Sequence, residues 1–344
     1  MAAGACEKRP CCTMKAIQFS RYGASDVLDL VERDIPVPDS NECLVQVAAA
    51  GVNPIDWKVR CGMLRHLLRV KLPFVPGSDV CGVVAQVGPR VKRHRPGDAV
   101  FAMVDARRAG CYAQYVSVHE ALCSPKPQTL SVDEAAAMPL AGLTALQALR
   151  DHGKLSAGQK ALVIGASGGV GHYAVQIAKA MGASVTGVCG EANIPMVREL
   201  GADRVIDYRQ TKLRRVEGRY DVVLDAVAMH SFRQCRHLMA PHAVFVTTLP
   251  KLHVLWRMAA MRSRSRARFL LVRPNSADLA FLGNLADQGR LRSIVGKAYP
   301  LAQARAAHDA SAAGHVRGKL VLHVEATTPM VVGDDVTPRR RPTL

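Results

Sequence analysis

The sequence lacks any C-x-x-C pair, although it contains 10 cysteines among 344 residues. Closely spaced cysteine pairs are typical of zinc lobes and of redox dithiols, so their absence argues against both. Scattered single cysteines in a chain without an export signal are more often small buried side chains in a reducing compartment. We therefore expect these cysteines to behave as apolar core residues.

Long apolar runs are also missing, since no stretch approaches the roughly 18 residues that span a bilayer. The start, MAAGACEKRPCCT, has no apolar core and does not resemble a secretory signal. It is also too short and too poor in arginine and serine for a typical transit peptide. Hydrophobic residues make up 49% and charged residues 22%, which excludes a disordered chain. We therefore expect a globular, cytoplasmic protein.

Acidic residues are scarce relative to basic ones: 28 Asp and Glu against 46 Lys and Arg give a net charge of +18. This surplus favours anionic ligands and partners. The most basic segment, 251–274, contains no acidic residue. We interpret it as a solvated surface that flanks a dimer edge, with an acidic carrier protein or a membrane surface as alternative partners. Nucleic acid is not expected, because no aromatic stacking platform accompanies the charge.

The pattern of apolar residues divides the chain into parts of different character. Residues 14 to about 135 carry β-branched and alternating apolar positions separated by Gly, Pro, Asn and Asp, which predicts strands. From KALVIG at 160–165 to HAVFVTT at 242–248, strand and helix patterns alternate, which predicts a parallel sheet covered by helices on both faces. Around 275–325 we expect a helix, a strand, an alanine-rich helix and the final strand.

A glycine-rich turn is the strongest functional signal. VIGASGGVGHYAVQIAK, residues 163–179, follows an apolar strand, opens a helix and fits G-x-G-x-x-G with alanine in the first place. Small residues keep the turn tight, Gly168 lets a pyrophosphate approach the backbone, and Gly171 lets the helix pack on the strand. The alternative is a glycine-rich turn without a ligand. The predicted dinucleotide cradle consists of Ala166, Ser167, Gly168, Gly169, Val170 and Gly171.

The choice between NAD and NADP depends on the end of the next strand, VCGEAN at 188–193. Glu191 could bind a ribose 2′-hydroxyl and favour NAD. Arg198, Arg204, Tyr208 and Arg209 could instead meet a 2′-phosphate. Because the surroundings are otherwise basic, we expect NADPH, with NADH as the alternative.

These motifs resemble the medium-chain dehydrogenase/reductase superfamily, and more narrowly its zinc-independent quinone oxidoreductase branch, which includes zeta-crystallin and the chloroplast-type quinone and enone reductases. The matching stretches include GVNPIDWKVRCG, LPFVPGSDVCGVVAQVG, MPLAGLTALQAL and GHVRGKLVLHV, and they span about 14–325 in the family order. One departure concerns the family's C-G-x-R-N, because Ala192 stands where the arginine would be. The cofactor-binding set that we expect also contains Asn193, Tyr208, Arg317 and Lys319.

The resemblance implies an α/β fold, with a doubly wound parallel sheet of Rossmann type and a β-rich, GroES-like catalytic domain. It also makes a homodimer the expected assembly. The boundaries that we predict are a mobile leader at 1–13, the catalytic domain at 14–138, the dinucleotide-binding domain at 139–280, a return to the catalytic domain at 281–326, and a disordered tail at 327–344.

The resemblance also bears on whether the protein holds a zinc ion. Zinc-using members place a cysteine where this chain has Asn53, a His-Glu pair where it has Ser78 and Asp79, and a further cysteine near Leu140. Amide, hydroxyl and leucine side chains do not form a catalytic zinc site. The loop that matches the separate zinc lobe, VDARRAGC, holds only Cys111. We therefore expect a protein that works without metal.

Without a metal, hydride addition to a conjugated acceptor is the more accessible reaction, because the charge spreads onto an oxygen that hydrogen-bond donors can hold. We predict an NAD(P)H-dependent reductase of quinones or of the C=C bond in α,β-unsaturated carbonyls. The Asn53 amide is the expected donor, Ser78 a second donor, Thr144 a neighbour of the nicotinamide, and Tyr112 a candidate proton donor. The structural alternatives are a turn asparagine, a capping threonine and a core tyrosine.

Two other functions remain open at this stage. One is a trans-acting enoyl reductase whose substrate is a thioester of coenzyme A or of a carrier protein. The other is a non-catalytic structural protein that keeps the cofactor fold.

Overall fold

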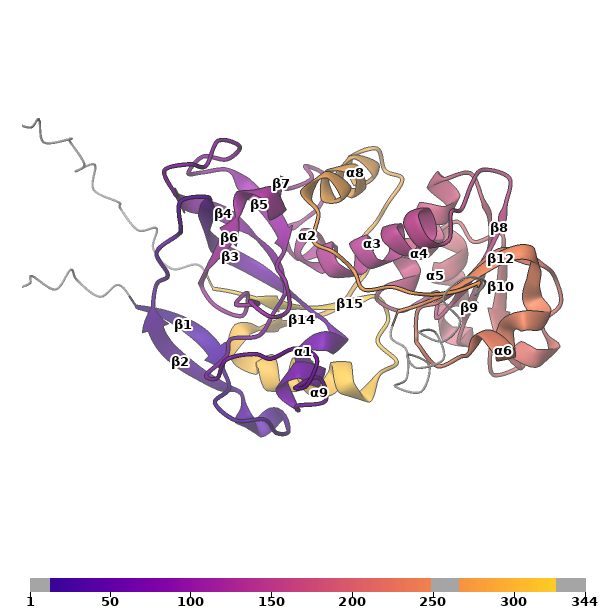
Figure 1. Ribbon diagram of the computed structural model, residues 1–344, viewed down its shortest axis with the longest axis horizontal. Coiled ribbons are helices and arrows are strands. Elements are labelled where there is room, and N and C mark those ends of the chain that lie inside the picture. The colour runs from indigo at the N-terminus through magenta and orange to yellow at the C-terminus, as the bar shows by residue number, and fades with distance from the viewer. Residues whose placement is uncertain (1–12, 249–265, 326–344) are drawn as a thin grey trace, which may run out of the picture.

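The structure, a computed structural model, describes residues 13–248 and 266–325 (Figure 1). Within these ranges the elements form a six-stranded sheet, a seven-stranded sheet and a two-stranded ribbon. Residues 1–12 of the predicted leader, the predicted tail and most of the basic segment 251–274 lie outside the described residues, whereas Thr13 begins the first strand. Within the described part, no helix is both long and apolar enough to cross a membrane.

The six-stranded sheet is parallel throughout and has the order β10-β9-β8-β11-β12-β13. This is the strand order of a dinucleotide-binding fold, with its switch point between β8 and β11. The strands are β8 (Lys160–Ile164), β9 (Ser184–Cys189), β10 (Arg204–Asp207), β11 (Tyr220–Asp225), β12 (Met239–Thr247) and β13 (Ala267–Phe269). Strand β13 lies in the part of 251–274 that the structure describes.

Short and long helices connect these strands. Among the described residues, the longest of them is α4 (Gly171–Ala180), which is almost entirely buried because its apolar side chains pack against the sheet. The others are η4 (Glu191–Asn193), α5 (Ile194–Glu199), η5 (Leu213–Arg215), α6 (Phe232–Cys235) and η6 (Arg236–Leu238).

The seven-stranded sheet gathers strands from both ends of the chain. Its order is β14-β15-β3-β4-β5-β7, with β6 also paired to β3. The strands are β3 (Glu42–Val52), β4 (Asp79–Val87), β5 (Ala99–Met103), β6 (Tyr115–His119), β7 (Cys123–Pro125), β14 (Val295–Pro300) and β15 (Lys319–His323). Because β15 runs antiparallel beside β3, residues near 320 lie next to residues near 50.

Smaller elements surround this sheet. They are the ribbon of β1 (Thr13–Gln18) and β2 (Asp29–Asp34), the short helices η1 (Ser25–Val27), η2 (Glu120–Leu122) and η7 (Leu301–Gln303), and the helices α1 (Pro54–Arg60) and α9 (Ala304–Ala313). Six of the seven cysteines that the structure describes are buried, and all seven are free, as the sequence predicted.

The two sheets meet around α2 (Val132–Ala137) and α3 (Pro139–Leu146), which lie at the centre of the molecule (Figure 1). One hydrophobic cluster includes residues of both sheets and of these helices, for example Cys81, Leu143 and Val163. The connection between the sheets is therefore a packed core, and α3 is held against both.

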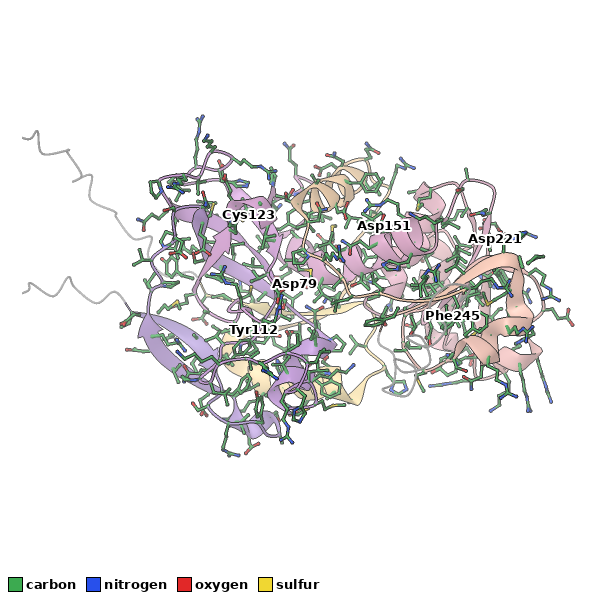
Figure 2. The ribbon with its side chains drawn as sticks, in the orientation of Figure 1. Asp79, Tyr112, Cys123, Asp151, Asp221 and Phe245 are labelled. Atoms are coloured by element: carbon green, nitrogen blue, oxygen red, sulfur yellow. The ribbon has the colours of Figure 1, made fainter. Side chains whose placement is uncertain are left out.

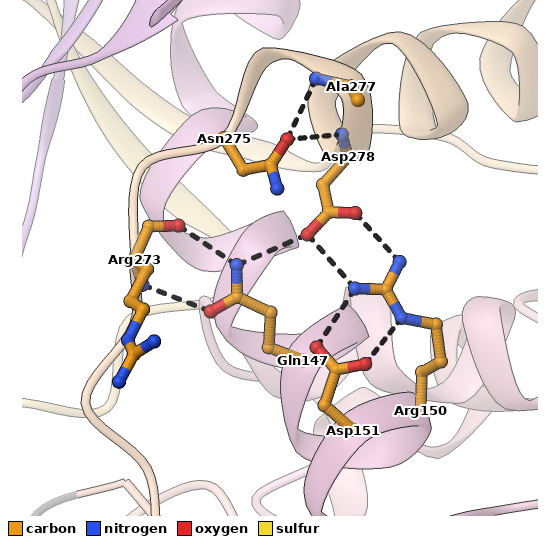
Figure 3. A network of polar contacts seen from close by, with 7 residues as sticks. All are labelled: Gln147, Arg150, Asp151, Arg273, Asn275, Ala277 and Asp278. Atoms are coloured by element: carbon orange, nitrogen blue, oxygen red, sulfur yellow. Dashed lines mark hydrogen bonds and ion pairs between the residues drawn. The ribbon is translucent and has the colours of Figure 1, made fainter.

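A polar network fixes the continuation of α3. The π-helical turn η3 (Gln147–His152) faces α8 (Ser276–Asp287), and Arg150 contacts both carboxylate oxygens of Asp278, at 2.7 and 3.1 Å (Figure 3). Gln147 binds the backbone of Arg273 through both atoms of its amide. These contacts connect the segment between β13 and α8 to the end of α3.

The fold class predicted from the sequence is confirmed, and so is the order of helix, strand, helix and strand between 275 and 325. The domain boundaries at 138/139 and 280/281 stay predictions.

Candidate functional site

The glycine loop begins one residue earlier than the sequence motif suggested. Strand β8 ends at Ile164, and Gly165 makes the turn with φ of +81°, a conformation that disfavours other residues. Gly168 donates its backbone N–H to the Gly165 carbonyl at 3.0 Å. A Cβ atom at Gly171 would overlap that same carbonyl oxygen, so only glycine lets α4 approach the strand so closely.

The loop presents backbone donors at the start of α4. The amides of Ser167, Gly169 and Val170 have no acceptor within the described part of the chain. Free amides at a helix N-terminus form a site for a phosphate group. A Cβ atom at Gly168 would meet only the Gly165 oxygen, at 3.4 Å, so the space beside Gly168 is otherwise open. These observations fit a dinucleotide pyrophosphate at the predicted cradle, although Ala166 itself is fully buried.

His172, which was not among the predicted site residues, forms a hydrogen bond to the backbone of this loop. Its Nε2 accepts the Ile294 N–H at 3.3 Å, so its Nδ1 donates to the Gly168 carbonyl at 2.9 Å. Burial lowers the pKa of His172 to about 4, which keeps the ring neutral in this arrangement.

A second group of polar residues lies where β15 runs beside β3. The Lys319 ammonium donates to Asn53 Oδ1 and to the Val52 carbonyl, the latter at 3.1 Å. Asn53 Nδ2 in turn donates to Asp79 Oδ2 at 2.8 Å, and the other oxygen of Asp79 accepts the Leu140 N–H at 2.8 Å. Lys319, Asn53 and Asp79 are only 3%, 1% and 0% exposed. The structure thus joins two predicted site residues, Asn53 and Lys319, through direct contact.

The network continues into the first turn of α1. Pro54 opens this helix, and the Asp56 carboxylate accepts the Asn53 backbone N–H at 2.8 Å, as expected of a capping residue. The same oxygen of Asp56 accepts the Tyr112 hydroxyl at 3.0 Å. Tyr112 is fully buried, and Figure 2 shows it with Asp79 in the half of the molecule formed by the seven-stranded sheet. Its only side-chain hydrogen bond among the described residues is therefore to Asp56.

Burial shifts the pKa values of the ionisable groups in this network. It raises the pKa of Asp56 to about 7, against the lowering effect of the bonds from Asn53 and Tyr112. It raises the pKa of Asp79 to about 6, against the opposing charge of Lys319. Burial also lowers the pKa of Lys319, while Asp79 opposes that change. The contact between the Lys319 ammonium and the Asp79 carboxylate, 3.6 Å apart, offsets part of the cost of burying both groups.

Ser78 and Thr144 lie beside the network, and within the described part of the chain neither makes a hydrogen bond to Lys319. Ser78 precedes Asp79, and its buried Oγ has no hydrogen-bond partner among residues 13–248 and 266–325. Thr144 is one helical turn after Leu140 and donates its hydroxyl to the Leu140 carbonyl at 2.6 Å. The roles predicted for both residues stay predictions.

The remaining predicted cofactor residues lie around the end of β9. Glu191 and Asn193 are in η4, just after the strand, and Tyr208 follows the neighbouring strand β10. A Cβ atom at Gly190 would lie 3.5 Å from the Tyr208 ring, so this exposed ring flanks the strand end. Arg317 instead reaches Met196, with its Nε 3.1 Å from the sulfur.

The cradle and the polar network adjoin each other. The Gly318 N–H donates to the Ser167 carbonyl at 2.9 Å. A Cβ atom at Gly169 would lie 3.2 Å from Cδ of Lys319. One strand, β15, therefore brings the glycine loop and the Asn53 network into a single site.

Comparisons with known proteins agree with this arrangement. Residues 39–128 match the alcohol dehydrogenase GroES-like domain, and residues 200–322 match the family described as zinc-binding dehydrogenase. The chloroplast envelope quinone oxidoreductase homolog of Arabidopsis thaliana is 37% identical over 322 residues, which cover 90% of this chain and 98% of that protein. The NADPH-dependent alkenal/one oxidoreductase, chloroplastic, of the same plant is 41% identical over 226 residues, 63% of this chain and 58% of that protein.

Among solved structures, the quinone oxidoreductase from Coxiella burnetii superposes with a TM-score of 0.84 and 34% identity, over 91% of this chain and 100% of that one. The fold and these relatives define an NAD(P)H-dependent oxidoreductase of two-sheet architecture. The chain belongs to the medium-chain dehydrogenase/reductase superfamily, in its quinone oxidoreductase branch.

The predicted cytoplasmic location is wrong. It depended on the composition of the first residues, whereas the two Arabidopsis relatives described above are named as chloroplast proteins. A targeting segment is read by import machinery and removed, so the fold places little constraint on its length or composition. Composition alone was therefore a weak basis for that prediction.

The residues present do not fit the zinc ion that the matched family description implies. The buried Lys319 ammonium, not a set of ligands, contacts Asn53 and Asp79. No group of three or more His, Cys, Asp or Glu side chains with metal-binding geometry occurs in the described ranges. Amide, hydroxyl and ammonium groups are poor zinc ligands.

Proposed function

We propose that this chain is an NAD(P)H-dependent reductase that transfers hydride to a quinone or to the C=C bond of an α,β-unsaturated carbonyl. The observation that carries the proposal is the junction of the glycine cradle with the Asn53 network through β15. The names of relatives that reduce quinones and alkenals or enones support the same reaction class.

The nicotinamide cofactor, when bound, supplies the hydride. The free amides of Ser167, Gly169 and Val170, at the start of α4, would hold its pyrophosphate. Nδ2 of Asn53 carries two hydrogens, and Asp79 accepts one of them. The other donates to the substrate oxygen, where negative charge develops as hydride arrives at the conjugated carbon.

The reaction also consumes a proton, and we assign its source to solvent. Burial raises the pKa of the Tyr112 hydroxyl well above its usual value, which makes it a weaker acid. The hydroxyl already donates its hydrogen bond to the Asp56 carboxylate. Tyr112 therefore holds Asp56, and Asp56 holds the backbone of Asn53.

A panel of acceptors tests the reaction class. Nicotinamide absorbance is followed with free quinones, free enones and enoyl thioesters, each with NADPH and with NADH. We expect turnover of free quinones or enones. Turnover of thioesters alone would favour the trans-acting enoyl reductase, and cofactor binding without any turnover would favour the structural protein.

For the cofactor we propose NADPH, because Arg209 lies over the Tyr208 ring at 5.9 Å beside the end of β9. Arg209→Ala should raise the Kd for NADPH about fivefold, the equivalent of about 1 kcal/mol, and leave that for NADH unchanged. Glu191→Ala should favour NADPH further, by removing a charge that repels the 2′-phosphate. The control is Arg95→Ala, which removes an exposed arginine next to the seven-stranded sheet and should leave both Kd values unchanged. Loss of NADH binding in Glu191→Ala would instead identify NAD as the cofactor.

The homodimer, the acidic carrier and the membrane surface remain proposals. They depend on the segment 251–274, most of which lies outside the described residues.

A further inference from the structure

Lys319 is a buried cation in a position that links separate parts of the chain. It is the first residue of β15 and only 3% exposed. A buried ammonium is tolerated only when it is hydrogen-bonded and paired. Here Nζ donates to Asn53 Oδ1 and to the Val52 carbonyl, and lies 3.6 Å from Asp79 Oδ2. The folded chain therefore provides this charge with three oxygen atoms.

The contacts of Lys319 join several elements of the site. Asn53 joins the end of β3 to α1, and Asp79 begins β4. Through its other oxygen Asp79 accepts the Leu140 N–H in the first turn of α3. The stem of Lys319 passes the cradle at Gly169. A single side chain thus lies beside the cradle and also contacts the residues at the ends of β3 and β4.

The same contacts determine how the Asn53 amide is oriented. Its oxygen faces an ammonium, which only donates, and its nitrogen faces a carboxylate, which only accepts. A flip of the amide would place donor against donor and acceptor against acceptor. The amide therefore has one stable orientation, in which a hydrogen of Nδ2 remains for a further acceptor.

We propose that Lys319, paired with Asp79, is the resident cation of this site and a positioning residue that holds the Asn53 amide ready to donate to the substrate oxygen. The proposal rests on the proposed function of Asn53. It also explains the disagreement with the zinc-binding family description, since the volume beside Asp79 is filled by a covalently attached cation.

A double-mutant cycle tests the proposal. Lys319→Met keeps the stem and removes the charge, and it should lower kcat for an enone about tenfold, as expected when the partner that orients a functional side chain is lost. Asn53→Ala should lower kcat more. Because Lys319 acts through Asn53, the double variant should be no slower than Asn53→Ala alone. The Kd for NADPH should change less than about threefold in all three variants.

The controls separate positioning from stability. Lys297→Met, in the neighbouring strand β14, removes an exposed lysine of the same sheet and should leave kcat unchanged. Should Lys319→Met fail to fold because Asp79 is left unpaired, the same cycle is run with Asp79→Asn in every variant. That change removes the unpaired buried carboxylate.

Each outcome is informative. Multiplicative losses in the double variant would show that Lys319 acts independently of Asn53, which overturns the positioning role and leaves the proposed function intact. A normal kcat in Asn53→Ala would overturn the donor role of Asn53 and the positioning role together. A loss of NADPH affinity in Lys319→Met that accounts for the whole rate effect would make Lys319 a cofactor-binding residue only.

Discussion

Replacing Gly168 by valine is expected to abolish binding of NADPH and NADH while the fold survives. A Cβ atom at this position makes only an ordinary contact, 3.4 Å from the Gly165 oxygen, so the backbone need not move. The branched side chain would instead occupy the open side of the loop, where Ser167, Gly169 and Val170 present their free amides. A pyrophosphate could no longer reach them. We expect the Kd to rise at least about 100-fold, the equivalent of about 2.7 kcal/mol.

Fluorescence titration measures the binding, and circular dichroism during thermal unfolding measures the fold. Gly171→Ala is the contrasting variant, because its methyl group would overlap the Gly165 carbonyl and displace α4. It should lower the unfolding temperature as well as the affinity. If Gly168→Val binds NADPH within about threefold of the wild-type Kd, the pyrophosphate does not lie on this loop.

The cradle could be predicted because its signal is local. Strand, small residues and helix follow one another within 163–179, and each glycine acts on neighbours close in sequence. Even so, the motif assigned the tight turn to Ala166, whereas Gly165 has the positive φ. A glycine directly after an apolar strand was the available signal. The parallel six-stranded sheet could be predicted for a similar reason, because the alternation of strand and helix patterns can be recognised within short segments.

The Asn53 network could not be predicted in this way. Asn53 and Lys319 are separated by 266 positions, and their contact exists only because β15 pairs with β3. The sequence predicted both residues as site residues but in separate roles, Asn53 as a hydrogen-bond donor to the substrate and Lys319 as a cofactor-binding residue. The missed signal was the isolated charges at the edges of apolar runs, as in GSDVCGVV and RGKLVLHV. Charges at such places are seldom buried unless they are paired.

Replacing Asn53 by alanine is expected to reduce kcat for an enone by about 100- to 1,000-fold, the range for removal of one donor to a developing oxyanion. The loss should be smaller for a quinone, about tenfold, because the charge of the reduced quinone spreads over its ring and depends less on a single donor. The Kd for NADPH should stay within about threefold, since no atom of Asn53 belongs to the cradle. Stopped-flow absorbance with each acceptor measures the hydride-transfer rate directly.

A purely structural asparagine would give a different result. Asn53→Ala leaves Lys319 and Asp79 short of one partner each, so the unfolding free energy should fall by about 1–3 kcal/mol whatever the catalytic role. Asn53→Asp restores an acceptor for Lys319 but offers no amide hydrogen, and it should remain as slow as the alanine variant. Asn284→Ala, at an exposed position of α8, controls for loss of an asparagine as such. If Asn53→Asp recovers the wild-type kcat for the enone, the amide hydrogen is not the donor, and the oxygen of the substrate must be held by another group of the site.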